Sequence, residues 1–177
     1  MVELIIQDFE KNKEIYNQIS KSLKDILGTS AHIDHVGSTA IPNMVGKNII
    51  DILVGFKDKC EYEKFAEILS KNGYFGSTNS KTEFYQFFAS SQNETKDGDV
   101  HIHLAMLRSE RYNEFIILKN YLLSNENEAL AYSNYKNEIL SSGITDRKEY
   151  RKIKSEYVTK LIKRAKKIIK MEKISYD

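Results

Sequence analysis

The sequence has few of the residues that cross-link or break a chain. Cys60 is the only cysteine and Pro42 the only proline among its 177 residues. One cysteine excludes an internal disulfide and any zinc site built from several cysteines, and the reducing cytoplasm is its natural setting. The lone proline leaves no proline-rich linker, which favours one domain over residues 1–177. We therefore predict a single-domain protein located in the cytoplasm.

Strong net charge and long apolar runs are missing as well. The chain has 27 Lys and Arg against 25 Asp and Glu, a formal net charge of +2. This balance gives no strong signal for nucleic-acid binding or for a membrane surface. No window approaches the roughly 20 apolar residues of a membrane span, and residues 1–9 lack the basic start of an export signal. Most of the excess basic charge lies in residues 136–173, where a solvated helix face is the simpler interpretation.

What remains is the composition of a folded protein, with 41% hydrophobic and 11% aromatic residues. Apolar residues at helical spacing predict two early helices, each followed by a glycine that can end it. Short apolar or aromatic runs between polar turns predict strands. The expected helices are residues 8–27 and 60–72, and the expected strands are 31–36, 48–56, 73–77, 82–89 and 99–107, with turns at 77–81 and 90–98. From residue 111 the pattern is helical, over 112–123, 126–140 and 146–169.

A phosphate site is predicted directly after the first expected strand, residues 31–36. Residues 35–42 read His-Val-Gly-Ser-Thr-Ala-Ile-Pro, so Gly37 and Ser38 form a turn at which backbone N–H groups can approach a phosphate. Ser38 and Thr39 are candidates as phosphate ligands and as N-cap residues of a short helix. Asp51 follows inside an apolar run, where an ionised carboxylate is costly unless it is paired or bound to metal. We therefore expect Asp51 to face the turn as a catalytic or metal-binding group.

Three motifs in this order resemble the GrpB family of the nucleotidyltransferase superfamily. They are residues 35–42, then 47–52 (Lys-Asn-Ile-Ile-Asp-Ile), then 101–104 (His-Ile-His-Leu), and the similarity continues through the helical segments to about residue 165. The resemblance implies an α+β fold: a nucleotidyltransferase-like mixed β-sheet with flanking helices and a helical C-terminal third from about residue 111. It also implies a bound nucleotide or phosphorylated small molecule and a divalent metal, which could be Mg²⁺, Mn²⁺ or Zn²⁺.

The metal ligands expected from the superfamily are only partly present. A second acid should follow Asp51 by two residues on the same strand face, but that position is Leu53, which cannot bind a metal. His101 and His103 share one face of a later strand, and imidazole suits Zn²⁺ or Mn²⁺. With Asp51 they could form a site of two histidines and one carboxylate. The alternative is that both histidines are hydrogen-bonded strand residues, or bind phosphate or a base directly.

Further candidates for nucleotide or phosphate binding are Lys47 and a set of helical residues. Two Tyr-x-x-x-Lys pairs place a phenol and an ammonium on one helix face, and helix-surface packing is the alternative for each. His35 precedes the turn, where a structural role is favoured over a phosphate contact. The aromatic residues 84–88 are most simply core residues of a strand. The helical candidates are Lys119, Tyr132, Lys136 and Lys154.

Two functional hypotheses follow. The first is an enzyme that holds a nucleotide at Gly37, Ser38 and Thr39 and moves a nucleotidyl or phosphoryl group with the help of a metal on Asp51. The second is a non-catalytic module, with a degenerate site, that binds a nucleotide, phosphorylated metabolite or coenzyme. Leu53 favours the module, whereas Asp51 beside a two-histidine strand favours the enzyme, towards which we lean. A homodimer is compatible with either.

Overall fold

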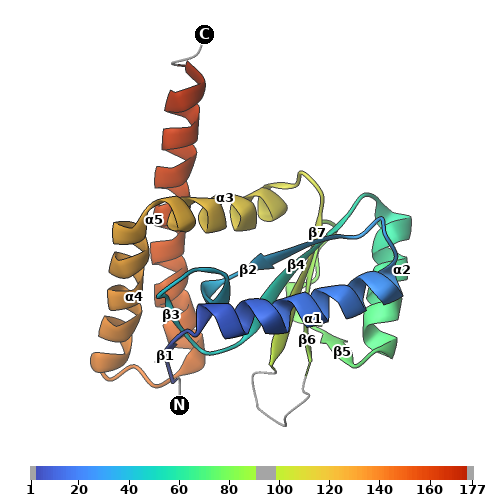
Figure 1. Cartoon of the computed structure of the whole chain (residues 1–177), viewed down its shortest axis with the longest axis horizontal. Helices are drawn as coiled ribbons and strands as arrows, with labels where there is room; N and C mark the ends of the chain where they lie inside the picture. Colours follow the sequence, from blue (N-terminus) through green and yellow to red (C-terminus); the bar gives the residue numbers. More distant parts are fainter. Residues whose placement is uncertain (1–2, 91–98, 175–177) are drawn as a thin grey trace.

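A five-stranded mixed sheet forms the centre of the protein, in a computed structural model that describes residues 3–90 and 99–174 (Figure 1). The strand order is β2-β4-β7-β6-β5; β4 and β7 are parallel and the other neighbours antiparallel. The sheet strands are β2 (His32–Val36), β4 (Ile50–Phe56), β5 (Tyr74–Gly76), β6 (Tyr85–Ser90) and β7 (Val100–Met106). A separate pair is formed by β1 (Ile5–Ile6) and β3 (Val45–Gly46).

Helices cover this sheet and then make up the whole C-terminal third. They are α1 (Phe9–Leu27), α2 (Lys59–Lys71), α3 (Glu110–Ser124), α4 (Glu126–Ser141) and α5 (Arg147–Ile174). Short 3₁₀ turns occur at Ser38–Ala40 and Thr78–Ser80. The predicted α+β fold with a mixed sheet and a helical C-terminal third is confirmed. The expected turn at 90–98 lies almost wholly outside the described residues.

Local signals explain where α1 begins and ends. The Asp8 side chain accepts a hydrogen bond from the Lys11 backbone N–H at 3.1 Å, which satisfies one of the free donors at the helix start. Gly28 ends the helix with a φ of 94°, a conformation that glycine adopts without a steric penalty. Leu23 and Leu27 are one turn apart and both buried, so this face of α1 packs on the sheet.

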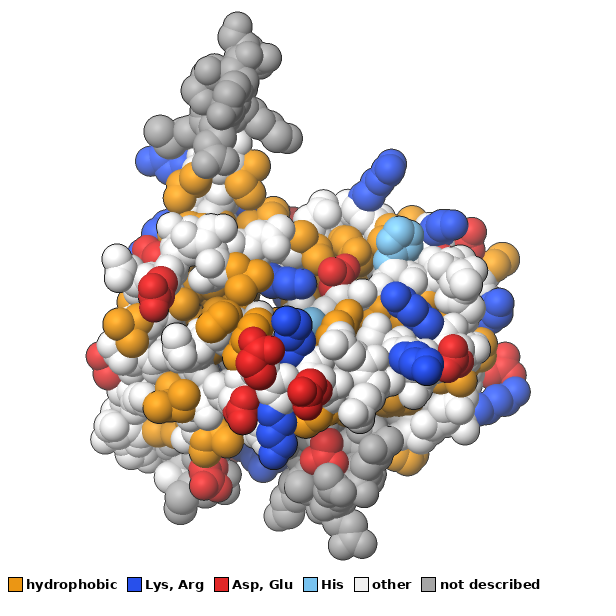
Figure 2. All heavy atoms as spheres, viewed as in Figure 1, with side chains coloured by type: hydrophobic (Ala, Val, Ile, Leu, Met, Phe, Trp, Pro, Cys, Tyr) orange, Lys and Arg blue, Asp and Glu red, His pale blue; other side chains and the backbone are white. Residues whose placement is uncertain are grey.

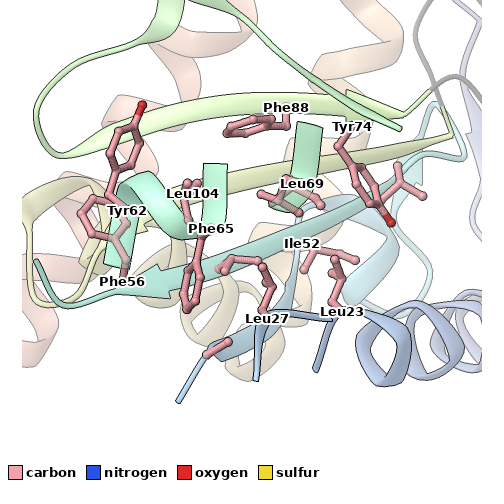
Figure 3. Packing of buried hydrophobic residues seen from close by; sticks show 14 of the residues in the cluster. Leu23, Leu27, Ile52, Phe56, Tyr62, Phe65, Leu69, Tyr74, Phe88 and Leu104 are labelled. Atoms are coloured by element: carbon pink, nitrogen blue, oxygen red, sulfur yellow. The ribbon is translucent and has the colours of Figure 1, made fainter. Parts of the chain in front are cut away.

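The alternation of β4 divides the molecule into a core side and a site side. Ile52 and its even-numbered neighbours in β4 point into the main core, where they pack with side chains of α1 and α2 (Figure 3). Asp51 and Leu53 point to the opposite face, which α3 partly covers. Leu53 is fully buried there against Val36 and Ala105, so the position of the missing second acid is a packed apolar contact.

Two features differ from the expected elements. β1 and β3 are only two residues long, too short to give a periodic signal. α5 continues to Ile174 instead of ending near residue 169, and its C-terminal end projects beyond the rest of the protein (Figure 1). Basic and acidic side chains are interspersed over the face seen in Figure 2, consistent with the small net charge. Among the described helices, we find none with the length and apolar character that crossing a membrane requires.

Candidate functional site

The Gly-Ser turn lies directly against Asp51. Val36, the last residue of β2, pairs with Asp51 at the start of β4, so the turn that follows β2 is held beside this carboxylate. Gly37 has a φ of +74°, and a Cβ atom added to it would lie 2.3 Å from Asp51 Oδ2. A side chain at position 37 would therefore be both strained and in collision with the carboxylate. Glycine is required for the turn to approach the acid this closely.

Asp51 is ionised and is held by two histidines of the neighbouring parallel strand. Its Oδ1 lies 3.2 Å from His101 Nδ1 and 3.4 Å from His103 Nε2, and 22% of the Asp51 side chain is exposed. Burial, the largest single influence, would raise the pKa of the Asp51 carboxyl, but the interactions with both histidines together outweigh it and hold the pKa below its ordinary value. An ionised carboxylate only accepts, so His101 Nδ1 and His103 Nε2 are the donors.

His103 is a neutral imidazole whose two nitrogens both have partners. Burial lowers its pKa, against the opposing effect of Asp51, so the ring stays uncharged. Its Nε2–H donates to Asp51, and its Nδ1 therefore accepts the Tyr85 hydroxyl, at 2.8 Å. Asp51, which can only accept, thereby fixes the tautomer, and the Tyr85 hydroxyl donates to the nitrogen that this tautomer leaves without a proton.

This arrangement does not fit the expected metal site. A metal would need the lone pairs of His101 Nδ1 and His103 Nε2, the nitrogens that here donate to Asp51. Within residues 3–90 and 99–174, no group of three or more His, Cys, Asp or Glu side chains is placed to hold a metal ion. The metal stays a prediction, and neither the ligand binding nor the positioning role proposed below depends on it.

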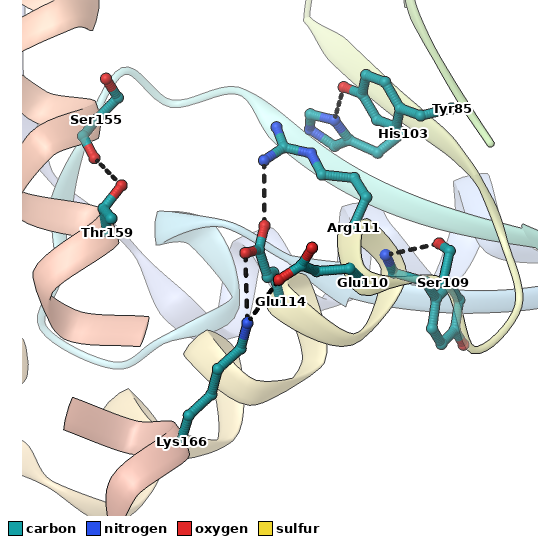
Figure 4. Close-up of polar contacts among 10 residues, drawn as sticks. Tyr85, His103, Ser109, Glu110, Arg111, Glu114, Ser155, Thr159 and Lys166 are labelled. Carbon is teal, nitrogen blue, oxygen red and sulfur yellow. Dashed lines mark hydrogen bonds and ion pairs between the residues drawn. The ribbon is translucent and has the colours of Figure 1, made fainter. Parts of the chain in front are cut away.

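Aromatic and basic side chains that the sequence analysis did not assign to the site surround the histidines. The Phe87 ring centroid lies 4.8 Å from that of His101, and the Phe115 centroid lies 4.4 Å from that of His103. Arg111 lies over the Tyr85 ring, 5.2 Å from its centroid. Figure 4 shows Arg111 below the Tyr85–His103 hydrogen bond. The i, i+2 spacing within residues 84–88 could have indicated this arrangement from the sequence, because it places two of these rings on the same sheet face as the histidines.

Arg111 also belongs to an ion-pair chain between α3 and α5. Its Nη1 lies 3.6 Å from Glu114 Oε2, and Lys166 of α5 lies 3.6 Å from Glu114 Oε1 and 3.1 Å from Glu110 Oε1 (Figure 4). The chain connects the last long helix with the aromatic residues beside His103.

His35 and Thr39 hold the turn from the inside. His35 Nε2 lies 3.0 Å from Thr39 Oγ1, which in turn donates to the Ile49 carbonyl at 3.3 Å, so the histidine donates to the threonine. The His35 ring stacks on Tyr16 at a centroid distance of 4.6 Å, and burial, assisted by the charge of Lys119, lowers its pKa to about 4. Because Thr39 is fully buried and its hydroxyl is engaged, we leave its side chain out of the proposed phosphate contacts.

Two of the predicted lysines, Lys47 and Lys154, interact with each other electrostatically, and Lys154 also interacts with Asp51. Lys154 of α5 is partly buried, and burial lowers its pKa; Asp51 opposes this effect, while Lys47 adds to it. Both groups are therefore close enough to act on Lys154 electrostatically. Lys47 Nζ lies 5.9 Å from the centroid of the Tyr150 ring, the tyrosine that precedes Lys154 by one helical turn. The structure thus connects Lys154 with Asp51 and Lys47, and Tyr150 with Lys47.

The other predicted binding residues have partners within the protein. Lys136 is 3% exposed and donates to the Val45 carbonyl, and burial, with the charge of Lys154, lowers its pKa to about 7. Tyr132 is buried and stacks on Tyr157 at 5.5 Å. Lys119 Nζ lies 3.9 Å from an oxygen of Asp34 on β2.

The fold is that of the nucleotidyltransferase-like proteins. The crystal structure of the conserved protein GrpB from Enterococcus faecalis matches with a TM-score of 0.81 at 21% identity, covering 94% of this chain and 99% of that one. A structure of Cid1, described by its RNA terminal uridylyl transferase activity, matches with a TM-score of 0.53 at 14% identity, covering 81% of this chain and 43% of that one. At these identities the similarity shows the fold alone.

Sequence comparison identifies the family. The model of the family described as GrpB protein matches residues 5–164. The glutamate-rich protein GrpB of Alkalihalophilus pseudofirmus is 26% identical over 162 residues, which are 90% of this chain and 93% of the relative. A UPF0157 protein of Streptomyces coelicolor is 23% identical over 165 residues, 93% of this chain and 85% of the relative. The chain belongs to the GrpB family, and the resemblance found from its motifs is confirmed.

Proposed function

We propose that this protein binds a nucleotide or another phosphorylated small molecule beside the Gly-Ser turn, between the start of β4 and helix α5. The observation that carries the proposal is that Lys154 lies within electrostatic range of both Asp51 and Lys47, while Asp51 lies directly against Gly37. Burial lowers the pKa of Lys154, so its charged ammonium form is disfavoured at this position. A bound phosphate would offset this cost through charge-assisted hydrogen bonds.

The turn adds a second kind of contact. Gly37 is exposed and has a positive φ, and Ser38 is partly exposed, so the turn is open to solvent beside the acid. Short backbone segments of this kind commonly cradle phosphates. The uridylyl transferase activity named for Cid1, which shares the fold, supports a nucleotide as the first ligand to test.

Isothermal titration with ATP and with inorganic pyrophosphate tests the proposal, each with and without Mg²⁺. We expect ATP to bind the wild type, and Lys154→Met to weaken binding about tenfold or more, since hydrogen bonds to charged groups are the stronger class. Lys160→Met is the matched control because Lys160 is an exposed lysine of the same helix. This variant should bind ATP with the affinity of the wild type. If neither probe binds, or if Lys154→Met binds as tightly as the control, the proposal is wrong.

A second candidate is metal-assisted nucleotidyl or phosphoryl transfer. It is favoured by the position of an ionised Asp51, directly against the turn that would hold the phosphates. Release of pyrophosphate from ATP in the presence of Mg²⁺ or Mn²⁺ and candidate acceptors, lost in Asp51→Asn, would support transfer. Binding without any turnover, and unchanged by Asp51→Asn, would instead support the non-catalytic module.

A further inference from the structure

Helix α4 holds strand β3 through two buried side chains. Ser133 and Lys136 lie three residues apart on α4, so they share a helix face, and each is 3% exposed. Ser133 Oγ accepts the backbone N–H of Val45 at 3.1 Å, and Lys136 Nζ donates to the Val45 carbonyl. One helix therefore satisfies both backbone polar groups of a single strand residue.

These hydrogen bonds occupy the edge of β3 that β1 leaves uncovered. β1 pairs with β3 in antiparallel fashion, with Ile6 opposite Val45. The flanking residues Met44 and Gly46 use their carbonyls for Gln7, through its backbone N–H at 2.9 Å and its side-chain amide at 3.0 Å. Because successive strand residues direct their backbone groups to opposite edges, Val45 presents its own pair towards α4.

β3 in turn supports the Gly-Ser turn. A Cβ atom added to Gly46 would lie 2.3 Å from Ser38 Oγ, so the serine side chain rests on the backbone of β3. Ser38 directly follows Gly37, whose own backbone rests on Asp51. A continuous line of contacts therefore runs from α4 through Val45, Gly46 and Ser38 to the carboxylate.

We propose that Ser133 and Lys136 form a clamp that fixes the Gly-Ser turn from the helical part of the protein, and that Lys136 is a positioning residue instead of a phosphate ligand. This inference deepens the proposed function, because it names what holds the turn in its binding geometry. Its statement about ligand binding rests on that proposed function. A Lys136 that turned towards a ligand would leave the buried Val45 carbonyl without a partner, which is costly.

The proposal separates two lysines that sequence spacing makes equivalent. Lys136 and Lys154 each follow a tyrosine by four residues. Lys154 is subject to the charges of Asp51 and Lys47, at the proposed binding position, whereas the Lys136 ammonium is engaged by a backbone carbonyl on β3. Loss of Lys154 should remove a ligand contact, and loss of Lys136 should loosen the turn.

Hydrogen–deuterium exchange on the full chain without ligand tests the clamp. In Lys136→Met, the segment 37–47 should exchange about tenfold faster, the effect expected when a buried hydrogen bond is lost. Strand segment 50–56 should exchange at the wild-type rate, which distinguishes local loosening from general destabilisation. Lys154→Met is the matched control and should leave segment 37–47 unchanged.

Ser133→Ala provides an independent test if Lys136→Met does not fold, since it removes the partner of the Val45 N–H, together with the hydrogen bond to Met44 Sδ, and leaves Lys136 in place. Faster exchange of segment 37–47 in this variant supports the clamp, and wild-type exchange overturns it. A folded Lys136→Met that loses ATP affinity with unchanged exchange in 37–47 also overturns it, because Lys136 would then act on the ligand directly. If the wild type does not bind ATP, the proposed function fails, while the exchange rates still decide whether the clamp exists.

Discussion

The buried ammonium of Lys136 makes a quantitative prediction about stability and pH. Burial and the charge of Lys154 lower the pKa of Lys136 from 10.5 to about 7 in the folded protein. Below pH 7 the lysine is protonated in both the folded and the unfolded state, so it adds no pH dependence. Between pH 7 and pH 10.5 only the unfolded chain keeps the proton, and the free energy of unfolding therefore rises with pH.

The size of this effect follows from the shift. One pKa unit corresponds to about 1.4 kcal/mol, so from pH 6 to pH 9 a single group with these two pKa values adds about 3 kcal/mol to the free energy of unfolding. The free energy of unfolding of the wild type, relative to that of Lys136→Met, should rise by this amount between pH 6 and pH 9. It isolates the one lysine because the other titrating groups are common to both proteins.

Urea unfolding of both proteins at pH 6 and pH 9 measures this difference. Lys154→Met is a useful companion, since removal of its charge should raise the pKa of Lys136 and reduce the gain in stability with pH. The ¹³Cε chemical shift of Lys136 gives a measurement that needs no variant and should titrate near pH 7. A stability difference that does not change with pH, or a chemical shift that titrates near pH 10, would refute the reasoning.

Three further predictions concern the site itself. Gly37→Ala should destabilise the protein by roughly 1–3 kcal/mol and abolish ATP binding, because φ is +74° and the new methyl meets Asp51; thermal unfolding and calorimetry measure both effects. Leu53→Ala should cost about 2–5 kcal/mol in urea unfolding because Leu53 is fully buried, and a near-neutral result would contradict the packing described. Tyr85→Phe should lower the free energy of unfolding by about 1 kcal/mol and shift the ¹⁵N resonance of His103 Nδ1, because it removes the hydroxyl that donates to this nitrogen; an unchanged Nδ1 resonance would show that the hydrogen bond is not made.

The sequence predicted those features of the fold that depend on local periodicity. Helix α1 and strand β4 carry their own apolar pattern, and caps such as Gly28 lie beside the elements they end. The placement of Asp51 near the turn also follows from local order, because the two segments are joined by a short connection. β1 and β3 were not predicted, since two residues cannot show a period.

The roles of individual site residues depended on contacts that sequence order does not contain. Lys136 and Lys154 have the same spacing from a tyrosine, and only the packing of β3 on α4 gives one of them a backbone acceptor. Tyr85 was assigned to the core because its strand is aromatic, and its hydrogen bond to His103 depends on the register between β6 and β7. Thr39 was predicted as a phosphate ligand, but its hydroxyl donates to the carbonyl of Ile49, a contact that sequence order does not reveal.

β4 carries the central apolar side chains on one face and the acid on the other, so the pairing that buries the apolar side chains also places the acid. A slip of one position in its pairing would send Asp51 into the apolar interior and expose Ile52. The acid can therefore be present in its place only in molecules whose central strands have already paired correctly. Molecules whose central strands are misaligned should therefore lack this arrangement of acid and turn altogether, and not possess a weaker version of it.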